Sequence, residues 1–360
     1  MYKLLDDGRF KEGKEAYMSG HFSRALEIFS QLAREGDAHA QFKLGVMYFY
    51  GRGIRQDMHE AAKWNLAAAE QGYIAAQYNM GIMYEHGHGV ACDHGEAFKW
   101  YQKAAAQGLA DAQFKLGNLY FNGHGVTRDK VEAASWYRKA AEQGYAVAQY
   151  NLGVLYEHGW GVPTDHVEAA KWYQRAARQG VAMAQFNLSV MYEEGRGVPQ
   201  DALQARRWND RAAEQGIPAA QFRLADRYYY GRYVPQDYAK AAEWCRKAAM
   251  QEYAEAQFNL GVMYARGTGV ESDDELAAEW FYAAGRSYLQ QGKRGLAMEA
   301  CEAIEKVAIE HVLARQLREE IGAFDKAYVD EPRDVWKPQP LMLGIGCVCM
   351  LGKELPASIS

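Results

Sequence analysis

The sequence predicts an all-α protein that is built as a solenoid of stacked helix pairs. The first observation is that the 360-residue chain matches itself at an interval of 36 residues in seven consecutive copies, and such an interval is typical of repeat architectures. The second observation is that the later half of each copy, such as 167–177, is rich in helix formers with apolar residues three and four positions apart. Two helices per copy are therefore the simplest interpretation.

Residues 1–39 precede the first copy, and we expect them to form a degenerate N-terminal capping repeat. The segment 16–26 has the pattern of a shortened helix pair. A solenoid needs such a cap because its terminal repeat has no neighbour to cover it.

The first half of each copy begins with Ala-Gln and an aromatic residue. With this alanine as position 1, the copies start at Ala40, Ala76, Ala112, Ala148, Ala184, Ala220 and Ala256. Periodicity alone leaves helix and strand both open for this half, so its helical assignment follows from the second half. Position 9 is tyrosine and position 12 is glycine in every copy, and glycine can adopt the positive φ that ends a helix.

The second half of each copy begins at an aspartate, position 18, which we expect to cap the second helix. In the first five copies Glu or Gln follows three residues later, which is a capping-box arrangement. The aspartates are Asp57, Asp93, Asp129, Asp165, Asp201, Asp237 and Asp273. The tryptophan at position 25 is expected to fill the core between the two helices and the neighbouring repeat.

These residues together resemble the Sel1-like repeat family, which is related to the tetratricopeptide repeats. The shared string is Ala-Gln-aromatic-x-Leu-Gly-x-x-Tyr, Gly-x-Gly-Val, Asp-x-x-x-Ala-Ala-x-Trp-Tyr and Ala-Ala-x-Gln-Gly, and it is complete in 148–180. The resemblance covers 40–284. It implies a right-handed α/α superhelix that holds a protein or peptide partner, as a scaffold or adaptor in bacterial signalling, envelope regulation or host interaction.

The candidate binding residues follow from the same resemblance. In tetratricopeptide repeats the first helices line a concave groove, which implies that position 4 of each copy points into it. These positions are Lys43, Asn79, Lys115, Asn151, Asn187, Arg223 and Asn259. Amides and cations suit an extended peptide, because amides donate and accept hydrogen bonds and cations bind carboxylates. The alternative left open is that this row is only the solvated side of the first helix.

Two further sets of side chains are candidates for the same surface. Position 11 varies between copies, as a recognition edge would, and includes His86 and His158. The sixth copy concentrates tyrosine and arginine, which are enriched in interface hot spots. Its members expected to be free of core packing are Tyr229, Tyr230, Tyr233, Arg227 and Arg232.

The fifth and sixth copies depart from the repeated pattern. Ser189 and Ala225 replace the glycine of the first helix, Tyr233 replaces the second glycine of the loop, and Glu252 replaces the glycine between copies. We therefore expect the sixth repeat to lie at an altered angle.

The C-terminal part of the chain differs in character from the copies. Residues 285–322 are expected to form capping helices, with a final amphipathic helix over 296–321. Residues 323–360 contain four of the eight prolines and are predicted to be a poorly ordered tail. The apolar run 341–351 in this tail, with Cys347 and Cys349, is a hypothetical autoinhibitory segment for the groove.

Composition excludes several classes of function. A net charge of −5 and a pI near 6.1 give no electrostatic footprint for nucleic acid. The longest apolar run is shorter than the roughly 20 residues of a transmembrane helix, and 1–20 lacks the apolar core of a secretory signal. Five irregularly spaced cysteines favour a reducing compartment, so a cytoplasmic location is expected. The oligomeric state is not predicted.

Neither a metal nor a cofactor is predicted. His86, His88, Cys92 and His94 surround one loop and could bind zinc, but equivalent histidines in other copies have no cysteine beside them, which favours a structural role. The segment 8–14 has the spacing of a phosphate-binding loop but lacks the following Ser or Thr.

A hydrolase is the alternative function. Cysteine-rich Sel1-like proteins are associated with β-lactam or cell-wall substrates, but they carry a cysteine pair in each repeat, which these copies lack. No serine is followed by lysine at the third position, as serine acylation would require. No catalytic residue is therefore predicted.

Overall fold

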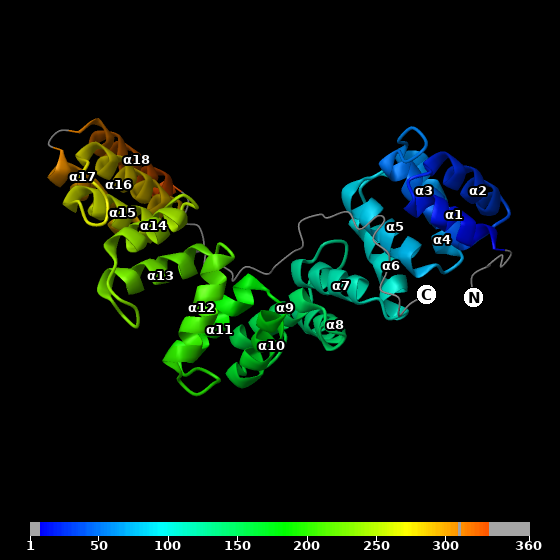
Figure 1. Cartoon of the computed structure of the whole chain (residues 1–360), viewed down its shortest axis with the longest axis horizontal. Helices are drawn as coiled ribbons and strands as arrows, with labels where there is room; N and C mark the ends of the chain where they lie inside the picture. The colour runs from blue at the N-terminus through cyan, green and yellow to red at the C-terminus, as the bar shows by residue number, and fades with distance from the viewer. Residues whose placement is uncertain (1–7, 309–310, 331–360) are drawn as a thin grey trace. The chain divides into compact units, whose positions relative to one another are not determined.

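The computed structural model describes residues 8–308 and 311–330, with side chains as far as residue 324. This part of the chain is helical, with 18 α-helices and no strand, which confirms the all-α prediction. The described chain consists of two compact bodies (Figure 1). The N-terminal body contains residues 8–165, and the C-terminal body begins at residue 166.

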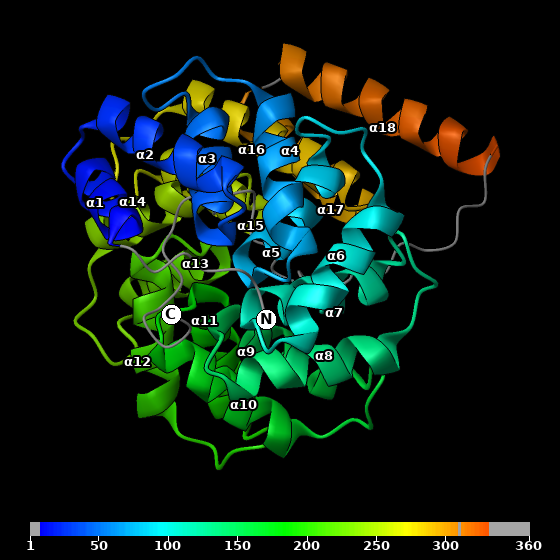
Figure 2. The same ribbon diagram turned by 90° about the vertical axis from the view of Figure 1, so that its right-hand side faces the viewer.

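The N-terminal body contains a leading helix pair, three complete repeats and the first helix of the fourth. Consecutive helices pack against one another, and Figure 2 shows α3 and α4 side by side. Its helices are α1 (Arg9–Met18), α2 (Phe22–Arg34), α3 (Ala38–Tyr50), α4 (Met58–Glu70), α5 (Ile74–His86), α6 (His94–Ala106), α7 (Ala110–Asn122), α8 (Lys130–Glu142) and α9 (Ala146–His158).

The C-terminal body contains the second helix of the fourth repeat, three complete repeats and two further helices. Its helices are α10 (His166–Arg178), α11 (Ala182–Glu194), α12 (Ala202–Glu214), α13 (Pro218–Tyr230), α14 (Tyr238–Ala249), α15 (Ala254–Arg266), α16 (Asp274–Gln290), α17 (Arg294–Val307) and α18 (Val312–Asp330). The last helices share an apolar core that includes Phe281, Ile304 and Leu317.

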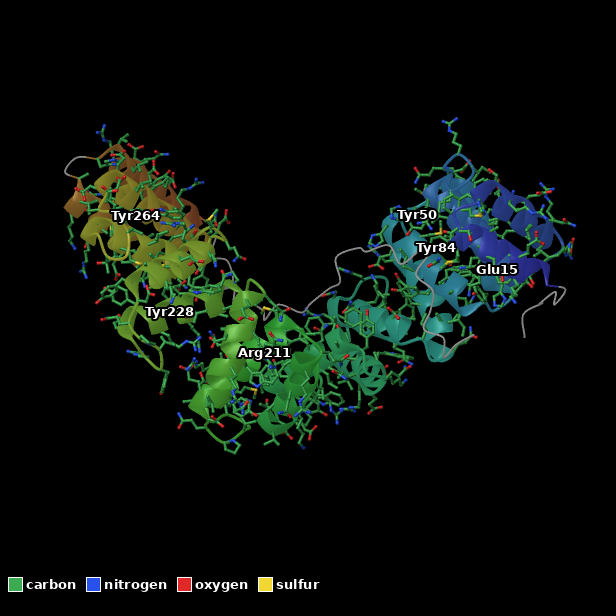
Figure 3. The ribbon with its side chains drawn as sticks, in the orientation of Figure 1. Glu15, Tyr50, Tyr84, Arg211, Tyr228 and Tyr264 are labelled. Carbon is green, nitrogen blue, oxygen red and sulfur yellow. The ribbon has the colours of Figure 1, made fainter. Side chains whose placement is uncertain are left out.

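The loop inside each repeat is closed by three local features, two of the backbone and one of a side chain. Glycine at position 12 ends the first helix in the left-handed conformation, as in Gly87 with a φ of 72°. The aspartate at position 18 accepts hydrogen bonds from the first turn of the second helix, as Asp93 does from Glu96 N (3.0 Å). The N–H of the same aspartate donates to the carbonyl of the position 9 tyrosine, for example Tyr84, Tyr228 and Tyr264 (Figure 3).

The expected capping box is only half formed. The side chain of Glu60 does not return to the capping aspartate but accepts hydrogen bonds from Lys63 Nζ (3.0 Å) and Trp64 Nε1 (3.1 Å). Asp57 alone therefore caps α4, through the N–H groups of His59 and Glu60.

The position 25 tryptophans lie against the core with one side toward solvent. Trp100, Trp172 and Trp208 are each 7% exposed. In the second to sixth repeats a cation three residues later covers the ring, as Arg211 does over Trp208 at 4.8 Å (Figure 3), a contact worth about 0.5–1 kcal/mol.

A buried glutamine joins each repeat to the one before it. Gln77, at position 2 of the second repeat, donates from Nε2 to the carbonyl of Ala69 (3.2 Å) and accepts at Oε1 from Gln107 Nε2 (2.8 Å). The same pairing recurs in both bodies, for instance between Gln185 and Gln215 (2.7 Å). These side chains donate hydrogen bonds to carbonyl groups in the last turn of the preceding second helix. Such carbonyls have no N–H partner within their own helix, because the helix ends there.

The C-terminal helices differ from the sequence prediction. Residue 285 lies inside α16, so no boundary falls there, and the single helix expected over 296–321 is divided into α17 and α18. Helix α18 continues to Asp330, beyond the expected start of the tail at 323, because residues 312–330 contain neither proline nor a further break. The apolar run 341–351, with Cys347 and Cys349, lies outside the described residues.

Replacing Gln77 by leucine is expected to destabilise the N-terminal body by about 1–3 kcal/mol. The substitution leaves the Ala69 carbonyl and the Gln107 amide without their buried partner. Urea unfolding followed by circular dichroism measures the change. Gln102→Leu on the exposed side of α6 is the control, and it should change stability by no more than about 0.5 kcal/mol; equal losses in both variants would contradict the role of the ladder.

Candidate functional site

The position 4 side chains do not share one environment. Asn79 is 2% exposed and Asn151 is 0% exposed, which corrects the expectation that every member of the row points into an open groove. The Nδ2 of Asn79 donates to Asn65 Oδ1 (3.2 Å), a residue of the second helix of the preceding repeat. Asn151 forms a hydrogen bond with the Tyr137 hydroxyl. Both amides therefore serve the packing between repeats, where buried polar groups require partners.

Lys115 lies in a charged cluster of the N-terminal body. Its Nζ donates to Glu85 Oε2 at 3.0 Å, and the two side chains are 15% and 20% exposed. Burial alone would raise the pKa of Glu85, but the charge of Lys115 and hydrogen bonds from Tyr101 and Lys115 outweigh it and lower that pKa. His86 lies beside this pair, with its Nε2 at 4.0 Å from Glu85 Oε1, and burial lowers its pKa.

Lys43 on α3, in the N-terminal body, is half-buried, with its Nζ 5.9 Å from the centre of the Tyr17 ring. The other three position 4 residues lie in the C-terminal body and are accessible. Asn187 and Asn259 are half-buried on α11 and α15. Arg223 on α13 is 40% exposed and forms an ion pair with Glu193 of the preceding repeat. This repeats the geometry of Lys115 and Glu85, with a cation at position 4 and an acid 30 residues earlier.

Two tyrosines of the sixth repeat line a small cavity. Tyr229 and Tyr230 pack edge to face with ring centroids 5.0 Å apart, and Tyr230 is 59% exposed. A cavity of about 150 Å³ lies between α13, α14 and α15, and its lining includes both tyrosines, Asn259 and Arg266. His158, in the other body, is exposed and stacks near Trp160 with ring centroids 5.0 Å apart.

A larger cavity of about 380 Å³ lies between the fifth and sixth repeats. Its walls come from α11, α12, α13 and the loop after α13. The lining residues are Ser189, Glu193, Gln200, Ala202, Ala205, Arg206, Asn209, Arg223, Asp226, Arg227, Arg232 and Tyr233. We call it the arginine pocket, because four of these side chains are guanidinium groups.

Asp226 lines both cavities, and the pKa of its carboxyl group is raised. Burial raises the pKa of its carboxyl group, and the charges of Arg232 and Arg223 offset part of that effect. Burial, and to a smaller extent the charge of Asp226, raises the pKa of the Cys245 thiol to about 12 against the opposing charge of Arg246. Most other repeats carry an aliphatic residue at this position, such as Val190 or Val262.

The cysteine and histidine loop of the second repeat is explained by its backbone contacts. The Cys92 thiol donates to the carbonyl of Glu85 (3.4 Å). In the equivalent place Gln200 donates to the Glu193 carbonyl (2.8 Å), so both side chains fasten the loop to the end of the first helix. Within the described ranges no group of three or more His, Cys, Asp and Glu side chains is arranged to hold a metal ion.

Several residues of the arginine pocket were not predicted from the sequence. Glu193, Arg206, Asn209 and Asp226 belong to it in addition to the predicted Arg223, Arg227, Arg232 and Tyr233. The available signal was the break in the repeat, because Asn209 replaces the tyrosine found at position 26 of the second to fourth repeats.

Helix pairs at a fixed interval, closed by glycine and capped by aspartate, define a repeat protein of the tetratricopeptide-like class. The chain belongs to the Sel1 repeat family. The Sel1 repeat model matches residues 38–73, 74–109, 110–145, 146–181, 182–217, 218–253 and 254–287.

Two solved structures are similar to this chain. The protective antigen c5321 of uropathogenic Escherichia coli strains, which displays an SLR fold, is 34% identical with a TM-score of 0.73; the match covers 85% of this chain and 67% of that one. A Sel1 repeat protein from Oxalobacter formigenes is 35% identical with a TM-score of 0.64, over 88% and 87% of the two chains. No match was found among the curated proteins.

The helices were also compared with the requirements of a membrane span. No helix within 8–308 and 311–330 is both long enough and apolar enough to cross a bilayer.

Replacing Asp226 by asparagine is expected to stabilise the protein at pH 7. Since the folded-state pKa of Asp226 is raised, the native state holds its proton more tightly, and wild-type stability rises as the pH falls through that pKa. Asparagine stays uncharged, so its advantage should shrink between about pH 7 and about pH 4. Thermal unfolding of both proteins across this range measures the difference; a variant that is less stable at pH 7 would contradict the burial argument.

Proposed function

We propose that this protein is a scaffold that binds an extended peptide or protein segment on the exposed side of its first helices, chiefly those of the C-terminal body. Sel1 and related helical repeats generally act in protein interaction. The proposal includes the setting that the family resemblance implies, in bacterial signalling, envelope regulation or host interaction. A cytoplasmic location stays a prediction from the sequence.

The observation that carries the proposal is the grouping of accessible polar and aromatic side chains on α11, α13 and α15. Asn187, Arg223 and Asn259 are accessible there, and Tyr229 and Tyr230 lie beside them around two cavities. Amides can pair with a peptide backbone, arginine with carboxylates, and tyrosine gives large contact area at low entropic cost.

The packing of the repeats holds the first helices in place, so the protein needs no conformational ordering when it binds a partner. Each first helix is fixed at both ends, by the buried glutamine ladder and by the loop hydrogen bonds to tyrosine and aspartate. A surface held in this way loses little conformational entropy on association, so a few anchors can give useful affinity.

Selection of peptides from a random display library against the full chain tests this function. A triple variant, Asn187→Ala with Arg223→Ala and Asn259→Ala, should lose at least about tenfold in affinity for the selected peptides. The matched control is Lys63→Ala with Lys99→Ala and Lys171→Ala, which removes exposed side chains from second helices.

One outcome would contradict the proposal. A triple variant that binds every selected peptide as tightly as the wild type, while its circular dichroism is unchanged, would place the binding surface elsewhere. The hydrolase alternative is not proposed, because no observation on the described residues favours it.

A further inference from the structure

We propose that the arginine pocket binds the carboxylate of an aspartate or glutamate side chain in the partner segment. This inference rests on the proposed function and deepens it, since it names the chemistry of one anchor. The occupant is an acidic peptide, and the pocket provides its specificity for negative charge.

The charges around the pocket favour an anion. Its lining holds the four guanidinium groups of Arg206, Arg223, Arg227 and Arg232 and the two carboxyl groups of Glu193 and Asp226. Asp210, which is not a lining residue, pairs with Arg227, and its carboxylate lies 3.5 Å from Arg206 Nε. Even with Asp210 included, four positive groups stand against three acidic ones, so the pocket has an excess of positive charge and favours an anion.

Two lining residues carry buried polar atoms that have no hydrogen-bond partner. They are Nη1 of Arg227, whose side chain is 12% exposed, and Oδ1 of Asn209, which is 5% exposed. The other amide atom of Asn209 donates to the Ala220 carbonyl (3.1 Å). Only the arginine atom is a donor: a buried guanidinium donor without a partner is costly, and a carboxylate is the group that best satisfies it. Asn209 Oδ1 is an acceptor, so it needs a donor and not a carboxylate.

Arg232 is the cation best placed to meet an incoming carboxylate. It lies at the exposed mouth of the pocket, on the loop after α13, with its guanidinium 4.8 Å from the centre of the Tyr230 ring. The ring contacts the face of the guanidinium, so the contact does not use its N–H edges, which are the groups for bidentate recognition. The charge of Arg232 also lowers the pKa of Asp226, so an incoming carboxylate would share this cation.

The pocket exists because one loop position of the sixth repeat, position 14, carries tyrosine in place of glycine. In the other repeats a glycine at position 14 lies against the start of the preceding second helix, as Gly197 does against His166 and Gly269 against Tyr238, with no room for a Cβ atom. Tyr233 stands at this position in the sixth repeat with a φ of 62° and a side chain that is 71% exposed. A tyrosine cannot make the same close approach, so a gap is left between its loop and Ala202.

A second substitution enlarges the same space. In the second and third repeats the position 6 glycine packs against the position 26 tyrosine, so that a Cβ on Gly81 or Gly117 would lie 2.5 Å from the ring. The corresponding pair in the fifth repeat is Ser189 and Asn209, and both line the pocket. Asparagine fills much less volume than tyrosine, and the difference is part of the 380 Å³.

The test measures binding of labelled peptides to the full chain by fluorescence anisotropy. Two peptides with blocked ends are used, one with glutamates spaced by alanine and serine, the other with glutamine in place of every glutamate. The glutamate peptide should bind at least about tenfold more tightly, and Arg232→Gln should remove at least about tenfold of its affinity. Arg207→Gln, an exposed arginine of α12 outside the lining, is the charge-matched control and should have no effect.

A second pair of variants tests the pocket without changing its charge. Tyr233→Gly restores the missing loop glycine, so it should close the gap and weaken the glutamate peptide about tenfold while relieving the positive φ. Glu252→Gly relieves the same kind of strain, at a φ of 61°, between the sixth and seventh repeats. It should leave the affinity unchanged.

Equal binding of the glutamate and glutamine peptides, or full affinity in both Arg232→Gln and Tyr233→Gly, would overturn the inference. A labelled single-stranded oligonucleotide is measured in parallel, and tight binding of it with none of the glutamate peptide would likewise overturn it. If display peptides still depend on the position 4 residues, the proposed function survives these outcomes; if no peptide binds at all, both fail.

Discussion

The buried side-chain amide at position 2 is the constraint on which the rest of the structure depends. Each such glutamine donates to the last turn of the preceding second helix and accepts from the glutamine at position 32 of its own repeat, as Gln221 does with Ala213 and Gln251. In the seventh repeat Ser287 supplies the donor to Gln257 Oε1 at 2.8 Å. Since a shift of one residue would bury several unsatisfied amides, the ladder fixes both the helix phase and the interval between repeats.

Within this fixed frame, the two cavities lie where the packing pair at positions 6 and 26 departs from glycine and an aromatic ring. A glycine against a ring, as with Gly261 and Phe281, leaves no space between the two helices of a repeat. Substitution of both members produces cavities, and Tyr233, whose Cβ prevents the close approach that glycine makes, keeps one of them open while its φ stays positive. Strain of about 1–3 kcal/mol at one loop position is tolerated because the hydrogen bonds of the ladder and the caps hold the neighbouring helices.

The sequence was sufficient to predict the features that repeat, because each is determined locally. Glycine at position 12 and aspartate at position 18 act on their own loop, and both take the expected conformations where the structure shows them. The exposure of position 4 could not be predicted in this way. It depends on whether the neighbouring second helix presents a partner, as Asn65 does for Asn79, and on how much space the side chain at position 26 leaves. The arginine pocket could not be predicted for the same reason. It forms only because Ser189, Asn209 and Tyr233, from two different repeats, all differ from the usual residues and lie around one space.

The same dependence explains why binding should concentrate in the C-terminal body. Lys115 and Glu85 form a largely buried pair, 15% and 20% exposed, and separating them would leave two desolvated charges. Arg223 and Glu193 repeat that geometry with exposures of 40% and 60%, where an ion pair is worth about 0–1 kcal/mol. A carboxylate from a partner can therefore replace Glu193 at little cost but cannot replace Glu85. One motif thus stabilises the fold in the second and third repeats and is open to exchange in the fifth and sixth.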